Sequence, residues 1–378
     1  MAQNIRGIPF DLPKLPTPVD YTTLFDDLRK ANSALTRLDE MLKHLPDPSR
    51  IERIFLSQEA VLSSKIEGTQ VTLEEVLKEE ADNSGKPVEE ISERGKDIKE
   101  IINYRQAFIQ GLKIIENGEL LTEDNVKKLH KILLRSVRGK TRAPGEFRRD
   151  QVYIAPPGTP MKDARYVPPS PIYVPDLYGN FDQYLNKPEA ERDPLVQIAI
   201  AHYQFEAIHP FNDGNGRLGR LLIPLFLFQR KIVARPLMYV SKYFEAHRSD
   251  YYDLLAAVSY KNEWTAWIRF FLHGLFEHAT HASTVGRNII ALQEKLRKGL
   301  SKFQSPYALN FLDAMFTRSY FTPTAIKQAA GLRNQQTALN LIRKFELAGI
   351  IRDVSPERKR NKIYEFTLLV KLLRERNS

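Results

Sequence analysis

Residues 209–220, with the sequence HPFNDGNGRLGR, constrain the fold more than any other stretch of the chain. The preceding residues, 193–208, are apolar with a helical period. The following residues, 218–228, are apolar nearly all round, which is typical of a buried helix. The pattern therefore predicts a helix, a glycine-rich loop and a second helix. The free backbone N–H groups and the positive dipole end of that second helix make the loop a candidate anion site.

The side chains of this loop suit a ligand that carries phosphate. Gly214 and Gly216 allow positive φ angles and let a phosphate approach the backbone closely. Arg217 and Arg220 lie about one helical turn apart and can each donate two hydrogen bonds to phosphate oxygens. Asp213 can hold a Mg²⁺ ion, because Mg²⁺ takes one or two carboxylates together with phosphate oxygens.

Two further residues of the loop offer a donor and a base. Asn215 can donate its amide to a phosphoryl oxygen, and His209 has the side chain best suited to take a proton from a hydroxyl near neutral pH. Ordinary structural explanations exist as well: a histidine before proline often packs or caps, Gly-Asn-Gly is often only a turn, and surface arginines are often solvated. Their concentration between two apolar helices favours a functional site.

The loop resembles the signature of the Fic family, His-x-Phe-x-(Asp/Glu)-Gly-Asn-Gly-Arg-x-x-Arg, and every fixed position matches. Members of this family typically transfer AMP from ATP to a protein hydroxyl. The two intact glycines favour nucleotidyl transfer over the kinase activity of a relative that replaces them. The resemblance implies that His209 is the base and Asp213 the Mg²⁺ ligand. It also implies that Asn215 contacts the α-phosphate, Arg217 the β/γ-phosphates and Arg220 the γ-phosphate, and that Phe211 is a core anchor.

The composition limits the compartment and the partners. The chain has 378 residues, a net charge of +10 and no cysteine, which excludes disulfides and Cys-ligated zinc and suits a reducing cytoplasm. Its first residues lack the apolar core of a signal peptide, and its longest apolar run, near 221–229, is too short to span a bilayer. We therefore expect a cytoplasmic protein with no membrane partner, and the basic balance favours a nucleotide or nucleic acid as partner.

Apolar periodicity predicts a mainly α fold, with a helical Fic-like core, a small β-hairpin flap and a C-terminal winged helix-turn-helix. Helices are expected near residues 21–45, 51–66, from 72, 89–116, 123–137, 193–208, 218–228, 241–260 and onward to 305. Thr72 and Glu75 predict a capping box at the start of the helix from 72. Residues 1–20 are expected to be extended, and residues 81–87 are expected to form a loop. The expected domains are an N-terminal helical region with an inhibitory motif over residues 1–100 and a Fic catalytic core over 101–285. A connecting helix is expected over 286–305 and a winged helix-turn-helix-like domain over 306–378.

The segment SSKIEG, residues 63–68, allows two interpretations. Taken alone, Glu67 is a charged residue near a helix C-terminus, where the helix dipole disfavours it. The segment also resembles the inhibitory motif of Fic proteins, (Ser/Thr)-x-x-x-Glu-(Gly/Asn), with Ser63, Glu67 and Gly68 in place. The resemblance implies that Glu67 pairs with Arg220 and denies it to the γ-phosphate. We therefore expect removal of this carboxylate to raise activity.

Residues 144–169 are β-like, because RRDQVYI and ARYV flank a Pro/Gly turn and predict a hairpin. An ordinary surface hairpin would have the same pattern. The position and the Gly-x-x-Arg lead-in, Gly145 to Arg148, resemble the flap of Fic proteins, which implies pairing with the backbone of a protein target.

The tyrosines and histidines after the loop are less specific. Tyr251 or Tyr252 can stack on adenine, although most tyrosines in such a stretch are packing residues. His273, His278 and His281 look like a metal trio, but His278 and His281 lack an acidic partner at a fitting spacing. We expect these histidines to lie on a helix surface.

The C-terminal part predicts a helix over 321–332, a helix over 333–350 and two strand-like runs, an order that resembles a winged helix-turn-helix. A module used only for packing or dimer contact would have the same order. If the module binds DNA, the recognition helix begins with Arg333, Asn334, Gln335 and Gln336, and the wing carries Arg358, Lys359 and Arg360.

These observations lead to one expected function and two alternatives. The first is an adenylyltransferase that uses ATP and Mg²⁺ to modify a Ser, Thr or Tyr hydroxyl of a protein, restrained by Glu67. The second is a DNA-binding regulator whose Fic core senses nucleotide. The third is a Fic enzyme that removes AMP, with Glu67 positioning a water, or that transfers another phosphate-containing group. The target, the trigger that releases Glu67 and the oligomeric state stay open, and family resemblance alone suggests a homodimer.

Overall fold

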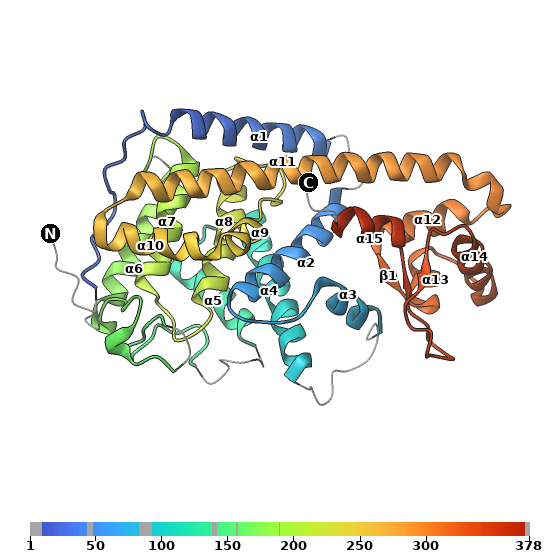
Figure 1. The fold of residues 1–378 in the computed structure, drawn as a ribbon, viewed down its shortest axis with the longest axis horizontal. Coiled ribbons are helices and arrows are strands. Elements are labelled where there is room, and N and C mark those ends of the chain that lie inside the picture. Colours follow the sequence, from blue (N-terminus) through green and yellow to red (C-terminus); the bar gives the residue numbers. More distant parts are fainter. Residues whose placement is uncertain are drawn as a thin grey trace. The chain divides into compact units, whose positions relative to one another are not determined.

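The computed structural model describes residues 10–43, 48–82, 93–135, 137, 142–155, 158–188 and 190–374. The expected extended start, the loop near 81–87 and the flap tip fall wholly or partly outside these residues. The chain forms two compact units (Figure 1). The first contains residues 1–39, 55–70 and 95–280, and the second contains residues 40–54, 71–94 and 281–378.

The first unit is built almost entirely from helices. It holds most or all of α1 (Phe25–Lys43), α2 (Pro48–Ile66), α4 (Glu93–Glu116), α5 (Glu123–Leu133), η1 (Met161–Asp163), η2 (Pro171–Tyr173), α6 (Val174–Asn186), α7 (Pro194–Ile208), α8 (Asn215–Gln229), α9 (Ser241–Ala246) and α10 (Arg248–Lys261). The long helix α11 (Trp264–Lys298) has residues in both units.

Helix α7 is the centre of the first unit and packs against α6, α8 and α10 (Figure 1). Its N-terminus is set by Asp193, whose carboxylate accepts a hydrogen bond from the N–H of Leu195 at 2.7 Å, and by Pro194 in the first turn. Every residue from Leu195 to Ile208 is buried, as expected for a helix that is apolar on all sides. The loop that follows α7 therefore starts from a rigid support.

The second unit contains a small antiparallel sheet among short helices. Its elements are α3 (Leu73–Asp82), η3 (Leu300–Phe303), α12 (Ala308–Thr317), β1 (Tyr320–Phe321), α13 (Pro323–Ala329), α14 (Gln335–Leu347), β2 (Arg352–Asp353), β3 (Tyr364–Glu365) and α15 (Thr367–Arg374). The strand order is β1-β3-β2, and Glu365 of β3 lies opposite Tyr320 on one side and Arg352 on the other.

Helix α3 packs on this sheet through apolar and ionic contacts. Its Ala81 joins a buried cluster with Tyr320, Ile363 and other residues of the second unit. Arg358 donates two hydrogen bonds to the carboxylate of Asp82, at 2.7 and 3.1 Å. The expected capping box opens α3: the N–H of Thr72 donates to Glu75 at 2.9 Å, and the N–H of Glu75 donates to the Thr72 hydroxyl at 3.3 Å. That prediction is confirmed.

The mainly α fold and the expected helices are confirmed, with ends shifted by a few residues. Helices α6, α12 and α15 and strand β1 were not anticipated. Among the described residues of the expected flap, its two arms are joined by a single antiparallel bridge, between Ile154 and Tyr166. The order α13, α14, β2, β3 agrees with the expected helix, helix and hairpin, whereas the assignment of a winged helix and the domain boundaries stay predictions. No helix among the described residues is long and apolar enough to cross a membrane.

Candidate active site

Two residues in the left-handed region mark the ends of the loop between α7 and α8. His209 is the C-cap of α7 with φ 49°, and Gly214 is the N-cap of α8 with φ 79°. Helix α8 begins at Asn215, three residues before the apolar run that predicted it. The backbone N–H groups of Asn215, Gly216 and Arg217 therefore belong to the first turn of a helix, where N–H groups lack helical partners. The predicted anion site has the backbone that it requires.

The loop is closed by contacts within itself and with α5. The Asn215 amide accepts a hydrogen bond from the N–H of Phe211 at 2.9 Å and donates to its carbonyl at 2.8 Å. Phe211 is fully buried, as expected for a core anchor, and stacks on His130 with ring centroids 3.8 Å apart. His130 contacts the carbonyl of Asp213 at 2.9 Å. The Asn215 side chain thus holds the loop shape, and the sequence analysis did not anticipate His130.

Arg220 is enclosed by the end of α2. It donates to Glu67 at 2.6 Å, to the Ser63 hydroxyl at 2.9 Å and to the Ser63 carbonyl at 2.8 Å. The Glu67 carboxylate also lies on the first turn of α8, because a Cβ added at Gly216 would be 2.2 Å from its Oε1. Gly216 is therefore needed for this close approach, whereas the expected positive φ occurs only at Gly214.

The segment 63–68 ends in a tight turn after α2. The N–H groups of Glu67 and Thr69 both bond to the carbonyl of Ser64, and that of Gly68 bonds to the carbonyl of Lys65, all at 3.0 to 3.1 Å. Gly68 has φ 101°, which favours glycine at this position. The turn presents the Glu67 carboxylate to α8.

The Glu67–Arg220 pair is ionised at neutral pH. Burial works to raise the pKa of Glu67, but the charge of Arg220 and its hydrogen bond outweigh burial and lower it below 4.5. Burial works to lower the pKa of Arg220, and the charge of Glu67 raises it above its ordinary value. The Arg220 side chain is 1% exposed and that of Glu67 is 37% exposed. One partner is therefore fixed inside the protein, and the other is reachable from solvent.

Arg217 is held by a second carboxylate that the sequence analysis missed. Its guanidinium lies 3.0 Å from Glu100 of α4, and both side chains are buried. Arg217 also lies 3.5 Å from Asp213, and the Thr69 hydroxyl lies 3.5 Å from Glu100. Thus each arginine of the loop is neutralised by a glutamate from outside the loop.

The His209 imidazole is oriented by the end of its own helix. Its Nδ1 lies 3.3 Å from the carbonyl of Glu206, which requires Nδ1 to donate and leaves Nε2 as the proton acceptor. Burial lowers the pKa of His209 to about 4; the hydrogen bond to Glu206 raises it, and the charge of Arg148 lowers it further. At neutral pH His209 is therefore uncharged and able to accept a proton.

The two candidate tyrosines have different surroundings. Tyr251 is buried in the core, and its hydroxyl contacts His202 at 3.0 Å. Tyr252 lines a mostly apolar cavity between the flap, α7 and α10, together with Ile154, Arg165, Tyr166, Tyr203, Glu206, Ala207, Leu255, Ala256 and Ser259. Tyr252 is thus the tyrosine available to a bound ring.

Glu206 is the unusual member of this cavity. Its carboxyl group is buried, and Oε1 has no hydrogen-bond partner among the described residues. Burial raises its pKa to about 8; the charge of Arg220 lowers it, and that of Glu67 raises it. A buried polar atom without a partner commonly marks a place for water or a ligand.

Comparisons with known proteins agree with this geometry. The Fic/DOC family N-terminal profile matches residues 25–113, and the Fic/DOC family profile matches residues 120–227, together more than half of the chain. The chain belongs to the Fic family. It is 29% identical over 235 residues to the protein adenylyltransferase Fic of Aedes aegypti and 30% identical over 235 residues to that of Drosophila virilis. The matched region is 61% of this chain and 41% or 42% of those relatives, so the chain spans about two fifths of their length.

The fold also has a counterpart among solved structures. A Fic family protein from Desulfovibrio desulfuricans G20 aligns with a TM-score of 0.56 at 22% sequence identity, covering 94% of this chain and 98% of that one. A likeness at this identity supports the fold. The alignment covers nearly all of the chain and is not limited to residues 209–220, which we call the Fic loop.

The Fic loop offers one carboxylate for a metal ion. The Asp213 side chain is 38% exposed and lies 3.5 Å from Arg217. No group of three His, Cys, Asp or Glu side chains with metal-site geometry occurs in the described part of the chain. A single carboxylate fits Mg²⁺ when phosphate oxygens and water complete the shell, and it does not fit a metal held by protein ligands alone.

The three histidines of α11 correct an expectation. His273 is half-exposed and contacts Glu277 at 3.1 Å. His278 and His281 are buried, and His278 contacts the carbonyl of Leu237 at 2.7 Å. The expected surface position is therefore wrong for His278 and His281, because α11 buries most of this face.

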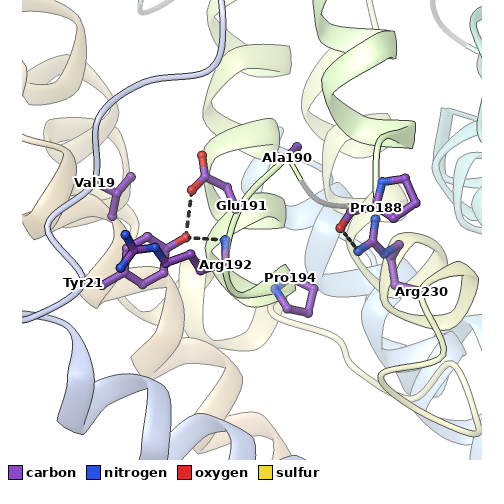
Figure 2. Close-up of a pocket in the computed structure, with 8 residues that line it drawn as sticks. All are labelled: Val19, Tyr21, Pro188, Ala190, Glu191, Arg192, Pro194 and Arg230. Carbon is purple, nitrogen blue, oxygen red and sulfur yellow. Dashed lines mark hydrogen bonds between the residues drawn. The ribbon is translucent and has the colours of Figure 1, made fainter.

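A large open pocket lies away from the Fic loop residues (Figure 2). There the Tyr21 hydroxyl donates to Glu191 at 2.7 Å and accepts from the N–H of Arg192 at 3.1 Å. Arg230 donates to the carbonyl of Pro188. The Tyr21 hydroxyl and the Arg230 guanidinium thus have partners within the protein, unlike Oε1 of Glu206 in the cavity beside Tyr252.

Proposed function

We propose that this Fic protein transfers AMP from ATP to a Ser, Thr or Tyr hydroxyl of a protein, and that Glu67 restrains the reaction. One observation carries the proposal. The Glu67 carboxylate, an anion, occupies the first turn of α8 against Gly216 and Arg220, where the Fic loop is built to receive phosphate. Curated relatives with the name protein adenylyltransferase support the choice of reaction.

The reaction is a displacement at the α-phosphorus of ATP. The target hydroxyl oxygen bonds to that phosphorus, the bond to the oxygen bridging to the β-phosphate breaks, and pyrophosphate leaves. His209 accepts the hydroxyl proton at Nε2, because its Nδ1 proton is engaged by the Glu206 carbonyl. Positioning and charge stabilisation account for the rest of catalysis.

The phosphates are assigned to the first turn of α8. Its free N–H groups, including that of Asn215, donate to phosphoryl oxygens, and Arg220 and Arg217 offset the negative charge. Asp213 would hold a Mg²⁺ ion, whose charge would offset negative charge on the phosphates. The Asn215 amide keeps the loop closed through Phe211, so its contact with the α-phosphate is assigned to the backbone.

The base of the nucleotide is assigned to the cavity lined by Tyr252. Its walls are mostly apolar, as a purine face requires, and Tyr252 offers a ring face. Tyr251 supports this wall from the core, where its ring lies 5.1 Å from that of Tyr252. The flap residues Ile154 and Tyr166 close the cavity from the other side.

Inhibition follows from competition for Arg220. The γ-phosphate of ATP and the Glu67 carboxylate need the same guanidinium and the same helix end. Because Ser63 also binds Arg220, the arginine stays in place when Glu67 leaves. Release of Glu67 therefore exposes a site that is already formed.

The test is label transfer from ATP. Wild-type, Glu67→Gly and His209→Ala proteins are incubated with Mg²⁺ and ATP labelled on the α-phosphate, alone and with a cell lysate. We expect strong labelling of protein by Glu67→Gly, little by wild type and none by His209→Ala. Label that enters protein only from γ-labelled ATP would mean a kinase. Loss of label from a pre-modified protein would mean AMP removal.

The C-terminal module has a separate test. DNA binding by residues 306–378 stays a prediction from the order of α13, α14 and the strands. Arg358 of the expected wing is engaged by Asp82. Among the residues expected to contact DNA, the exposed cations are then Arg333 of the recognition helix and Lys359 and Arg360 of the wing. Retardation of duplex DNA that disappears when these three are changed to Gln would support binding. The homodimer and the cytoplasmic location stay predictions as well.

A further inference from the structure

Arg148 is a buried arginine whose side-chain partners are all main-chain carbonyls. Its side chain is 2% exposed. Nε donates to the carbonyl of His209 at 2.8 Å, and one terminal nitrogen lies 3.4 Å from the carbonyl of Ile208. The guanidinium also donates to the carbonyls of Asp150, at 3.2 Å, and of Pro169. Over the described ranges, no carboxylate forms an ion pair with it.

A guanidinium buried without a counter-charge is costly, so its place needs a physical cause. Burial lowers the pKa of Arg148 to about 10, which leaves it charged at neutral pH. Its hydrogen bonds reach the last carbonyls at the end of α7, which no helical N–H can satisfy. A cation at a helix C-terminus is also favoured by the helix dipole. Arg148 is in effect the cap of α7.

The capped residue, His209, is the proposed base. Its φ of 49° and ψ of 59° lie in the left-handed region, which costs a residue with a side chain about 1 kcal/mol. Its N–H bonds to Phe205 at 3.0 Å, its Nδ1 lies 3.3 Å from the carbonyl of Glu206, and its carbonyl accepts from Arg148. These three contacts fix both the backbone and the ring.

The other two carbonyls bound by Arg148 lie at the base of the flap. Asp150 precedes the flap arm that contains Ile154, and Pro169 follows the arm that contains Tyr166, its bridge partner. The backbone N–H of Arg148 adds a bond to the carbonyl of the residue after His209, at 2.9 Å. One side chain thus joins both arms of the flap to the loop.

We infer that Arg148 is a positioning residue that locks His209 to the base of the flap, so that the imidazole and a target hydroxyl presented along the flap keep a fixed separation. The inference rests on the proposed AMP transfer. In this inference, Arg148 fixes the geometry of proton transfer from the target hydroxyl to His209. The phosphates are assigned to the opposite end of the loop, where Glu67 lies against Gly216 and Arg220. Loss of Arg148 therefore lowers kcat more than it raises the KM for ATP.

The charge of Arg148 also acts on the titration of His209. The charged groups that face the imidazole are Arg148, which lowers its pKa, and Glu67, which raises it. In a Glu67→Gly protein only Arg148 remains. Because proton transfer needs the neutral imidazole, removing the charge of Arg148 raises the pKa of His209 above about 4 and moves the acid limb of the activity profile to higher pH.

The experiment separates hydrogen bonding from charge. Arg148→Lys keeps the charge and loses the planar fork, and Arg148→Gln loses both. The matched control is Arg149→Gln, because the neighbouring Arg149 side chain is 88% exposed and lies 3.5 Å from Glu146. All three changes are made in the Glu67→Gly protein. Kinetics of AMP transfer are measured from pH 4 to 9, and folding is checked by thermal denaturation.

We expect Arg148→Lys to lower kcat roughly 10- to 100-fold, with the KM for ATP within about 3-fold of the parent and the acid limb unmoved. Arg148→Gln is expected to lower kcat further and to move the acid limb upward by about half a pH unit or more. Arg149→Gln should match the parent. Unchanged kcat in Arg148→Lys, or a rise in the KM for ATP that equals the fall in kcat, would overturn the inference.

A second measurement keeps the inference independent of the proposed function. The His209 ring is titrated by NMR in the Glu67→Gly protein and its Arg148 variants, with His209→Ala used for assignment. A higher midpoint in Arg148→Gln than in Arg148→Lys supports the inference, and equal midpoints contradict it. If Arg148→Gln does not fold, Arg148→Lys against the parent decides through kcat. If the parent transfers no AMP, the proposed function fails and the NMR titration still tests the role of Arg148.

Discussion

The arginines of the Fic loop and those of the C-terminal module differ in burial. Arg217 and Arg220 have side chains that are 5% and 1% exposed, whereas those of Arg352 and Arg358 are 53% and 36% exposed. All four have a carboxylate partner. A charge inside the protein destabilises it strongly when its partner is removed, whereas an exposed pair contributes about 0–1 kcal/mol. The same residue type with the same kind of partner therefore has a different consequence in each region.

The difference teaches where a charge pattern indicates function. In the loop, each arginine draws a glutamate from a distant part of the sequence, Glu67 or Glu100. Under the proposed function, those carboxylates lie where phosphates bind or beside that place. In the C-terminal module the arginines of the ion pairs are at least one third exposed, although Glu365, the partner of Arg352, is buried. We therefore expect large effects on activity and stability in the loop and small effects in the module.

The largest effect is expected from His209→Ala in the Glu67→Gly protein. Loss of the proton acceptor should lower the rate of AMP transfer about 10²- to 10⁴-fold. The matched control is His273→Ala, because His273 is half-exposed on α11 and its ring nitrogen contacts Glu277. Initial rates with α-labelled ATP measure both. A His209→Ala rate within a few-fold of the parent would show that proton transfer is not the task of this loop.

The next effect is on stability, through the buried pair of the loop. Glu100→Gln leaves the charge of Arg217 buried and only partly compensated by Asp213, so we expect a loss of about 3 kcal/mol in the free energy of unfolding. Urea denaturation followed by circular dichroism measures it. A loss below about 1 kcal/mol would mean that the Glu100–Arg217 pair contributes no more to stability than an exposed ion pair, and the difference between the two regions would disappear.

Removal of Glu67 tests a carboxylate whose exposure lies between that of the buried Glu100 and that of a fully exposed side chain. Glu67→Gly should raise AMP transfer roughly 10- to 100-fold, equivalent to about 1.4–2.8 kcal/mol of competition for Arg220. Lys65→Ala is the control, because Lys65 lies at the same helix end and pairs with Glu245 on the surface. The control should leave the rate unchanged. Equal stimulation by both changes would attribute the effect to loosening of the helix end.

Glu206 should make stability depend on pH. Its pKa in the folded protein is raised to about 8 from 4.5, so the folded state keeps a proton that the unfolded state releases. Stability from this group is complete below about pH 4.5 and is lost as pH rises through 8. Glu206→Gln should therefore reduce the fall in unfolding free energy between pH 5 and 8 by up to about 3 kcal/mol. Denaturation curves at the two pH values measure it, and parallel losses in both proteins would contradict the assignment.

The smallest effect is expected in the module. Arg358→Gln removes both hydrogen bonds to Asp82, yet both side chains are about one third exposed, so the loss should stay below about 1 kcal/mol. It should also weaken as salt is raised. Thermal denaturation at low and high salt measures it. A loss above about 2 kcal/mol, independent of salt, would mean that this pair behaves like those of the loop.

Much of the fold was predictable because local patterns dominate in helices. The apolar run around α7, the capping box at Thr72 and the glycines of the loop each act within a few residues of chain. The weak points are elements whose signals are short. Strand β1 has two residues, and the flap has a single bridge, so neither leaves a clear alternating pattern.

The candidate site was predictable in its loop and not in its supports. The proximity of Glu67 to Arg220 was expected from family resemblance, not from spacing, because more than 150 residues separate them. Glu100, Arg148 and Glu206 act through burial and tertiary contact, and no local pattern distinguishes a buried glutamate from one on a helix surface. The Gly-x-x-Arg lead-in was the one signal that pointed to Arg148, and it was noted only as part of the flap.

The central claim is that the Fic loop binds ATP phosphates where the Glu67 carboxylate now lies. A crystal structure of the Glu67→Gly protein with Mg²⁺ and a non-hydrolysable ATP analogue tests it directly. We expect the γ-phosphate to lie beside Arg220 and Gly216 and the adenine ring to lie against Tyr252. A nucleotide bound elsewhere, or phosphates that leave Arg220 and the first turn of α8 untouched, would contradict it.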